Sequence, residues 1–247
     1  MEKNSEFHLS YSRITIYDNC PLRYKFIYVD ELPTAARSYF SFGNSIHKVL
    51  ELFYHPEENF ITAKTPPLNY LLGLLNEHWI SAGYNTEYQE KKAKEEAVQL
   101  LTKFYRETIF GFQPAYLVEK SFSFELNGFR VIGRIDRIDQ GNDGYSIIDY
   151  KTNRILPSFF KKINLLQPII YYLGAKESLG LNKISSVSMY FVRFNKKVEF
   201  NISDEMAEEG KQKILQVGKA IQCNEFSPTP GSACSTCEFK DRCTGFQ

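Results

Sequence analysis

The stretch GRIDRIDQGNDGYSIIDYKT, residues 133–152, decides the fold of this chain. Two segments rich in Ile, Val, Phe and Tyr, 128–139 and 144–151, are separated by a cluster of turn-forming residues. Such runs with Asn-Asp flanked by Gly between them are typical of a β-hairpin. The sequence therefore predicts two antiparallel strands joined by a two-residue turn at Asn142 and Asp143.

The register of this hairpin brings two carboxylates together. With that turn, Asp136 lies opposite Asp149, and cross-strand partners share a face roughly 5 Å apart. Because side chains alternate along a strand, Lys151 points the same way as Asp149. Two acids beside an ammonium could hold a divalent metal and assist the hydrolysis of a phosphodiester bond. The alternative is a solvated Asp–Lys pair, but the adjoining apolar Ile147 and Ile148 favour a partly buried site.

Composition limits the class of protein. The chain has 247 residues and a net charge of +1, so no global basic excess indicates nucleic acid, and any such surface must be a local patch. The start, MEKNSEFHLS, has no apolar signal region, and no apolar run reaches the length of a membrane helix. We therefore expect a soluble, cytoplasmic protein with no membrane partner.

Periodicity predicts the remaining elements: helices at 41–54, 68–82, 86–110, 159–179 and 203–222, and strands at 115–126 and 187–194. Pro168 must kink the fourth of these helices or mark its start. The order of helices, three strands, helix, strand and helix predicts an α/β fold with a mixed central sheet flanked by helices. We expect one domain over 1–247, divided into a helical insertion at about 55–112, a core at about 113–200 and a C-terminal helix with a Cys cluster at 203–247.

Four of the five cysteines look organised. Cys234, Cys237 and Cys243 form C-x2-C-x5-C, and Cys20 lies in DNCPLRY near the N-terminus. In a reducing compartment this spacing indicates a metal site rather than disulfides. Cys20 would be the fourth thiolate, since either tetrahedral zinc or an iron–sulfur cluster needs four. Spacing alone does not choose between the two, and Cys223 has no partner in the pattern.

Taken together, these residues resemble the PD-(D/E)xK nuclease superfamily, in particular RecB-like exonucleases that carry an iron–sulfur cluster. The nuclease domain of AddB helicase–nucleases and the CRISPR-associated four-cysteine nucleases are similar by pattern. Seven pieces occur in the expected order: Ser12-Arg13-Ile14, Cys20-Pro-Leu-Arg-Tyr, Gly43-Asn-Ser-Ile-His47, Gly133-Arg-Ile-Asp136, Asp149-Tyr-Lys151-Thr, Gln167-Pro-Ile-Ile-Tyr171 and the final cysteine trio.

The resemblance implies a restriction-endonuclease-like core and a set of roles for its residues. It implies that a catalytic Mg²⁺ or Mn²⁺ is bound by His47, Asp136, Asp149 and the backbone carbonyl of Tyr150. Lys151 would orient or activate the attacking water.

The resemblance also assigns two groups outside the metal ligands. Gln167 and Tyr171 match an element that lies beside the active site and contacts DNA. A [4Fe-4S] cluster on Cys20, Cys234, Cys237 and Cys243 would serve as a structural staple that clips the C-terminus to the N-terminal segment.

Two further acids are candidates to support the metal ligands. Glu51 lies one helical turn beyond His47, on the same side of the helix. Glu119 lies on the strand that precedes the hairpin. For Glu51 a solvated helix face is an equally good interpretation.

These observations lead to three hypotheses of function. The first is a metal-dependent deoxyribonuclease, an exonuclease on single-stranded DNA or DNA ends, in CRISPR adaptation or DNA repair and recombination. The second is a DNA-end-binding and trimming subunit of a larger integrase or helicase complex with little activity alone. The third is a zinc-clipped binding module without catalysis. The sequence has no Walker A motif, so a motor would be a separate partner.

Overall fold

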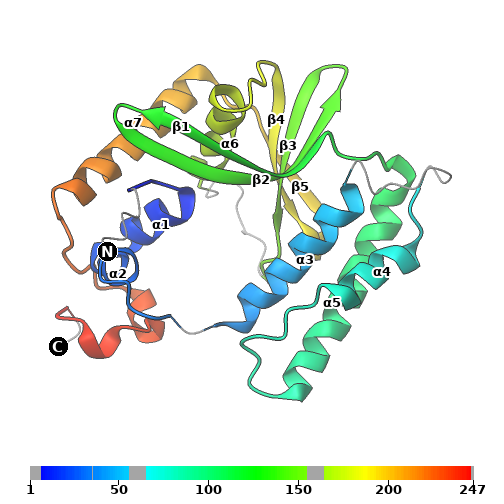
Figure 1. Ribbon diagram of the computed structural model, residues 1–247, viewed down its shortest axis with the longest axis horizontal. Coiled ribbons are helices and arrows are strands. Elements are labelled where there is room, and N and C mark those ends of the chain that lie inside the picture. Colours follow the sequence, from blue (N-terminus) through cyan, green and yellow to red (C-terminus); the bar gives the residue numbers. More distant parts are fainter. Residues whose placement is uncertain (1–6, 35, 56–64, 155–163, 246–247) are drawn as a thin grey trace, which may run out of the picture.

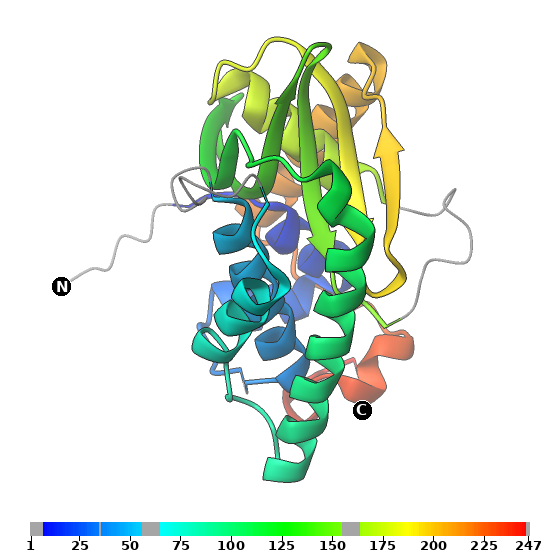
Figure 2. The same ribbon diagram turned by 90° about the vertical axis from the view of Figure 1, so that its right-hand side faces the viewer.

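A five-stranded mixed sheet forms the centre of the molecule in a computed structural model, which describes residues 7–34, 36–55, 65–154 and 164–245 (Figures 1 and 2). The strands lie in the order β1-β2-β3-β4-β5, and every neighbouring pair is antiparallel except β3 and β4, which are parallel. Their bounds are β1 Leu117–Leu126, β2 Phe129–Gly141, β3 Gly144–Lys151, β4 Ile184–Phe191 and β5 Lys196–Phe200. The predicted α/β fold with a mixed sheet is confirmed.

The predicted hairpin register is also confirmed. The β2–β3 ladder runs from the pair Gly141–Gly144 to the pair Arg137–Ile148, around the two-residue turn. The next position places Asp136 beside Asp149, where the regular ladder ends. The two acids of the sequence pattern therefore lie where the strands begin to diverge.

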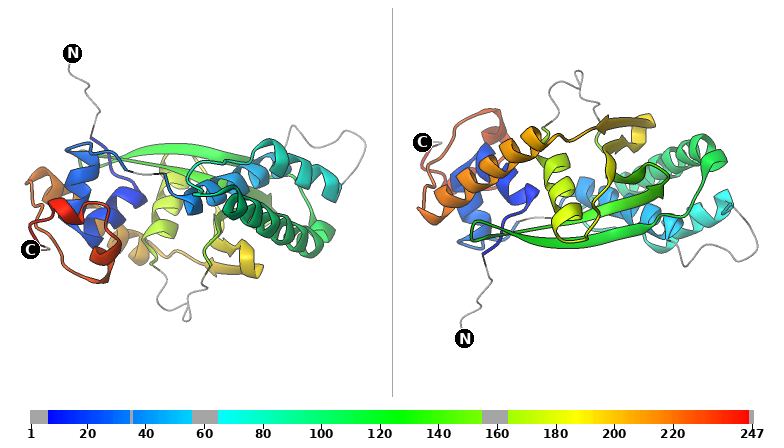
Figure 3. Two further views of the ribbon diagram at one scale, coloured as in Figure 1. Left: turned by 90° about the horizontal axis from the view of Figure 1, so that it is seen from below. Right: turned by 90° about the horizontal axis from the view of Figure 1, so that it is seen from above.

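Helices cover both faces of the sheet (Figures 1 and 3). On one face lie α3 (Ser38–Tyr54), α4 (Leu68–Glu77) and α5 (Glu87–Thr108), and on the other lie α1 (Tyr11–Asn19), α6 (Leu166–Glu177) and α7 (Asp204–Gln222). The neighbouring residues Ile147 and Ile148 show the division, because the first packs in the core with α6 and α7 and the second in the core with α3 and α5. Burial on both faces explains the continuous apolar run of β3.

Several elements differ from the sequence-based expectation. The helix predicted to extend to residue 82 ends at Glu77, and the strand predicted at 187–194 begins at Ile184 and ends in a 3-10 turn, η3 (Val192–Phe194). Helix α2 (Pro21–Tyr28), together with α1 and β5, was not predicted, and neither were the short turns η1 (Ile109–Gly111), η4 (Ser232–Thr236) and η5 (Lys240–Arg242). Hydrophobic periodicity misses α1 and α2 because they are short and have little one-sided apolar character.

Helix α6 connects the parallel strands β3 and β4 and carries the predicted Gln167–Tyr171 element. Pro168 is its third residue, in the first turn, where the missing N–H needs no intrahelical partner. The proline therefore marks the start of the described helix and does not kink it. The earlier part of the predicted helix, 159–163, lies outside the described residues.

Close packing of α6 on the sheet depends on two glycines. A Cβ atom at Gly133 of β2 or at Gly174 of α6 would collide with the ring of Phe122 on β1. That ring in turn meets the Tyr171 ring edge-on, with 6.2 Å between the centroids. Gly133 therefore has a packing role in the motif that carries Asp136.

The C-terminal tail packs against the N-terminal helices (Figure 3). Glu238 forms ion pairs with Arg23 of α2 at 3.0 Å and with Arg37 at 3.1 Å. The rings of Phe26 and Phe239 lie 5.3 Å apart. The segments that carry the four patterned cysteines are therefore neighbours. Among the described residues, no helix combines the length and apolar character needed to cross a membrane.

Candidate active site

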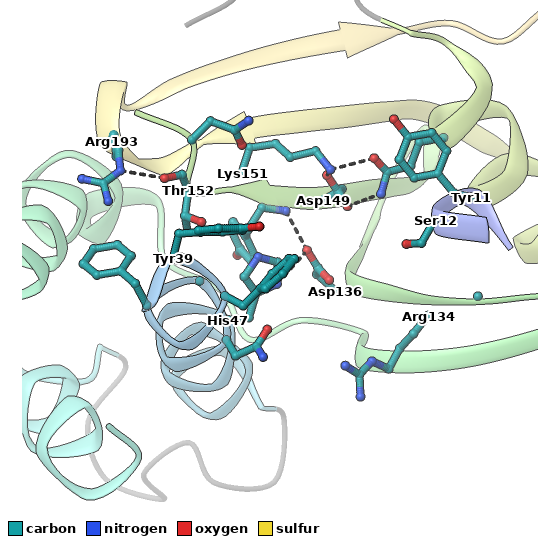
Figure 4. A pocket seen from close by; sticks show the side chains of 18 of the residues that line it. Tyr11, Ser12, Tyr39, His47, Arg134, Asp136, Asp149, Lys151, Thr152 and Arg193 are labelled. Carbon is teal, nitrogen blue, oxygen red and sulfur yellow. Dashed lines mark hydrogen bonds and ion pairs between the residues drawn. The ribbon is translucent and has the colours of Figure 1, made fainter. Parts of the chain in front are cut away.

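A cavity of about 1100 Å³ opens where β2, β3 and α6 face the first residues of α1 and one side of α3 (Figure 4). It contains the carboxylates of Asp136 and Asp149, and its described lining includes four cationic side chains: Arg134, Lys151, Arg154 and Arg193. A cavity with acids within it and cations around them can attract a polyanion while holding a divalent cation.

Asp149 is the most heavily engaged acid of the cavity. Its Oδ1 accepts hydrogen bonds from Gln167 Nε2 and from the Tyr171 hydroxyl, each at 3.0 Å, and Lys151 Nζ lies 2.6 Å from its Oδ2. Burial raises the pKa of Asp149, and the charge of Asp136 adds to the rise, while Lys151 opposes it. The lysine therefore favours the charged carboxylate in a site that would otherwise favour the acid form.

Gln167 links this acid to the lysine. Lys151 Nζ donates to Gln167 Oε1 at 2.6 Å, and Gln167 Nε2 also donates to the Tyr171 hydroxyl at 2.9 Å. Burial first, and then the charge of Asp149, raises the pKa of Tyr171 well above its ordinary value, so its hydroxyl stays a donor. The i, i+4 pair of α6 thus holds Asp149 and Lys151 in place.

Asp136 connects the hairpin to α3. Its Oδ2 accepts a hydrogen bond from the Tyr150 backbone N–H at 2.7 Å and lies 3.3 Å from His47 Nδ1 (Figure 4). Burial lowers the pKa of His47, but the hydrogen bond and charge of Asp136 outweigh burial, and the net shift is upward. Tyr150 thus contributes its backbone N–H to Asp136, and a role of its backbone carbonyl as a metal ligand stays a prediction.

Glu119 is the residue whose importance the sequence understated. One ligand atom each from His47, Glu119 and Asp136 lies within 4.8 Å of the other two, and no other group of three His, Cys, Asp or Glu in the described part of the chain meets this criterion. Glu119 faces Asp136 in the β1–β2 register, and both residues are missing from an otherwise continuous ladder. Extending the strand pairing from the hairpin to the preceding strand, β1, places Glu119 opposite Asp136 and could have identified it from the sequence.

The backbone at Glu119 is strained. Its backbone φ of 45° lies in the left-handed region, which residues other than Gly and Asn rarely adopt. The inward–outward alternation of side chains along β2 is also interrupted opposite Glu119. Ile135 and Ile138 pack in the same core although they are three residues apart, an odd number that regular alternation would place on opposite faces. Strain of this kind persists where the surrounding structure enforces it, and it concentrates at functional sites.

The donor atoms fit a hard divalent cation. Glu119 Oε2 and Asp149 Oδ2 are shielded from solvent, and each lies beside a cation. Arg134 Nε is 2.5 Å from the first oxygen, and Lys151 Nζ is 2.6 Å from the second. Buried carboxylate oxygens next to an imidazole form a set of donors that Mg²⁺ or Mn²⁺ can bind. Glu51, in contrast, pairs with Lys48 at 2.9 Å and is not part of this group.

The cysteines do not form a compact ligand set. Cys20 lies between α1 and α2, and the tail cysteines lie in and after η4 and η5. No three of their sulfurs in the described residues lie within 4.8 Å of one another. A single tetrahedral zinc ion, with Zn–S bonds of about 2.3 Å, would hold them roughly 3.8 Å apart. The staple therefore is not shown by the structure. Cys223 is exposed.

The sheet and the cavity together define a nuclease-like core, in which a central hairpin carries two aspartates and a lysine. The chain belongs to the PD-(D/E)XK nuclease superfamily, whose sequence model matches residues 8–244. A search of curated proteins finds no match.

A solved structure shares this fold. A crystal structure from Eubacterium rectale, named provisionally as an exonuclease, is similar with a TM-score of 0.56 and 10% identity, over 98% of this chain and 92% of that chain. The structure of SSO0001 matches at 15% identity over 86% of this chain and 98% of its own length, and its TM-score of 0.37 carries no argument.

Proposed function

We propose that this protein is an Mg²⁺- or Mn²⁺-dependent deoxyribonuclease that removes nucleotides from single-stranded DNA or DNA ends. The observation that carries the proposal is the convergence of Asp136, Asp149, Lys151 and His47 on one cavity. Glu119 lies close to two of them, His47 and Asp136. Membership of the nuclease superfamily and the fold shared with the Eubacterium rectale protein support it.

The metal would be held by the buried acids and the imidazole. His47, Glu119 and Asp136 provide the close group of donors, and the buried carboxylate of Asp149 offers a further oxygen ligand. When bound, such an ion lowers the pKa of a water ligand and neutralises charge that develops on the phosphate. The Tyr150 N–H fixes one oxygen of Asp136 and so orients the other.

Lys151 acts on the attacking water and on the phosphate. Its ammonium is held between Asp149 and Gln167, each at 2.6 Å, and is part of the cavity wall. A fixed cation stabilises negative charge as it accumulates on the phosphate oxygens, and its third N–H is free to orient a water molecule. Gln167 and Tyr171 restrict the motion of both partners and thereby preserve this geometry.

The rim of the cavity supplies phosphate contacts. Arg134 and Arg154 have side chains that are 65% and 76% exposed, and both line the cavity. Arg193 is fixed by donating to the Thr152 carbonyl at 2.6 Å and by pairing with Glu96. The three arginines are the candidates for the local basic patch, although Arg134 pairs with Glu119 and the other two share Glu96.

The test is cleavage of end-labelled single-stranded and duplex DNA by the purified protein with Mn²⁺ and with Mg²⁺. We expect shortening from an end, abolished by a chelator, and a loss of about 10²- to 10³-fold in kcat for Lys151→Ala. Lys48→Ala is the matched control, because Lys48 lies on the neighbouring helix α3 and pairs with Glu51. Full activity of Lys151→Ala would refute the mechanism.

The four patterned cysteines are proposed to hold a [4Fe-4S] cluster as a structural staple. Support comes from the donor number and from the packing of the two segments through Glu238 and Phe239. A cluster distributes its thiolates over four iron atoms, so its ligands stand further apart than those of one zinc ion. Anaerobic protein should be brown and contain about four iron and four sulfide per chain; a colourless protein with one zinc would refute the cluster.

The proposed setting is DNA repair, recombination or CRISPR adaptation, with an integrase complex or a helicase as partner. The alternative role, a subunit that trims ends only inside such a complex, predicts little degradation by the isolated protein. The same end-labelled assay separates the two, and its product lengths give the polarity.

A further inference from the structure

Two large aromatic side chains lie exposed beside the candidate active site. Tyr39 and Phe40, in the first turn of α3, are 56% and 59% exposed, and both line the cavity that contains Asp136 and Asp149. Their ring centroids are 4.3 Å apart. Figure 4 shows the Tyr39 side chain on the α3 side of the cavity, together with His47. Neighbouring aromatic side chains of this size are usually buried, so their exposure needs an explanation.

The surroundings of this aromatic pair favour a nucleic acid over another apolar surface. The guanidinium of Arg37 lies 6.0 Å from the centre of the Tyr39 ring and donates to its hydroxyl at 3.3 Å. Arg37 is in turn held by Glu238 at 3.1 Å, so the Tyr39 ring is anchored at its polar end. A fixed ring with a cation beside it, in a cavity rimmed by arginines, matches the chemistry of bases attached to phosphates.

Helical geometry connects the aromatic pair to the acids. Phe40, Gly43, Asn44 and His47 follow the i, i+3, i+4, i+7 spacing of one helix face, and all four line the cavity. Seven residues of helix separate Phe40 from His47 by roughly 10 Å along the axis. Nucleotides spaced by about 3.4 Å would bridge this distance in about three steps, and in fewer if the strand is extended.

We propose that Tyr39 and Phe40 form a stacking platform for unpaired bases, which guides a single DNA strand across the cavity with its backbone toward Asp136 and Asp149. This rests on the proposed nuclease function and adds a selectivity to it. A base inside a duplex already stacks on its neighbours and is paired, so it reaches the rings only after unpairing. The platform therefore favours single strands and frayed ends over intact duplex.

The test measures binding without chemistry, at one fixed salt concentration and with a chelator present. Two single-stranded probes with equal numbers of phosphates are compared by fluorescence anisotropy: an oligothymidylate and a strand made only of abasic nucleotides. The wild-type protein should bind the first about 5- to 100-fold more tightly. Tyr39→Ala combined with Phe40→Ala should bind both probes alike, and duplex affinity should change less than about twofold.

Three variants make the result specific. Tyr39→Phe with Phe40→Tyr keeps both rings and should keep the preference for the base-bearing strand. Phe110→Ala removes a 97% exposed ring outside the cavity and should behave as wild type. Thermal unfolding of each variant should match that of the wild-type protein, since the two rings are exposed.

An unchanged preference in the double alanine variant overturns the proposal. So does a change in oligomeric state by light scattering with unchanged DNA binding, because the rings would then cover a protein interface. Failure of the proposed nuclease function is distinguishable: a protein that cleaves no DNA with any metal, yet loses its base preference in the double variant, has the platform without the catalysis.

Discussion

Gln167 donates from its amide nitrogen to Asp149 at 3.0 Å, while its carbonyl oxygen accepts from the lysine beside that acid at 2.6 Å. One side chain therefore orients both a metal-binding candidate, Asp149, and the ammonium of Lys151, which is proposed to act in catalysis. The family resemblance implies a DNA contact at this residue, whereas its polar atoms are already used inside the site. Its main effect should then be on catalysis rather than on substrate binding.

Replacing Gln167 tests that distinction. Gln167→Leu removes the hydrogen bonds to Asp149, Lys151 and Tyr171. It should lower kcat by about 10- to 100-fold, the usual cost of losing a group that orients a ligand, with little change in KM. Gln167→Glu places an acceptor against Asp149 and should be worse. The measurement is steady-state cleavage of a single strand with Mn²⁺. A raised KM with unchanged kcat would instead identify Gln167 as a DNA contact.

Glu119 should show a conflict between stability and metal binding. In the described part of the chain, four other residues besides glycines have a positive φ, and three of these four are Asn. Glu119→Asn should therefore relieve roughly 1 kcal/mol of strain and raise the Tm of metal-free protein. It removes a carboxylate from the group with His47 and Asp136, and Mn²⁺ affinity should fall at least about tenfold.

The control for this prediction is Glu51→Gln. Glu51 was the other acid suggested by the sequence, but it pairs with Lys48 and lies outside the group of donors. The Mn²⁺ affinity of the Glu51→Gln variant, measured by calorimetry, should equal that of the wild-type protein. Equal losses in the two variants would indicate a general electrostatic effect and contradict a ligand role for Glu119.

The tail should depend on the ion pairs of Glu238. Glu238→Gln leaves Arg23 and Arg37 without their shared anion, and because the three side chains are only partly exposed the free energy of unfolding should fall by about 1 kcal/mol. Trypsin should then cut the tail faster at Lys240 and Arg242. Asp30→Asn, which breaks a pair with Lys25 near the end of α2, should leave tail cleavage unchanged.

The sequence predicted those parts of the candidate site that depend on local turn and strand geometry. It did not predict the parts that depend on an irregular backbone or on tertiary packing. Turn chemistry and strand alternation gave the hairpin register and hence the neighbourhood of Asp136, Asp149 and Lys151. Glu119 could not be ranked as highly, because its position depends on a left-handed residue within a strand, which alternation does not anticipate. Gln167 and Tyr171 were recognised as a pair, but their partners across the core follow from how α6 docks, which is a tertiary contact.

Docking of α6 should be sensitive to a single methyl group. Gly174→Ala places a Cβ atom against the Phe122 ring, which is buried and also contacts Tyr171. Such overpacking should cost about 1–3 kcal/mol in the free energy of unfolding. Gly73→Ala, in the middle of α4 with nothing within 4 Å of a new Cβ, should instead stabilise by about 0.5–1 kcal/mol.

A double-mutant cycle by urea denaturation identifies the cause. Phe122→Leu frees space beside Gly174. Gly174→Ala should therefore lower the free energy of unfolding less in the Phe122→Leu variant than in the wild-type protein, with a coupling energy of about 1 kcal/mol. Additive effects would show that Phe122 is not the obstacle. Because the same ring supports Tyr171, Gly174→Ala should also lower kcat, while Gly73→Ala, on the far side of the sheet, should leave it unchanged.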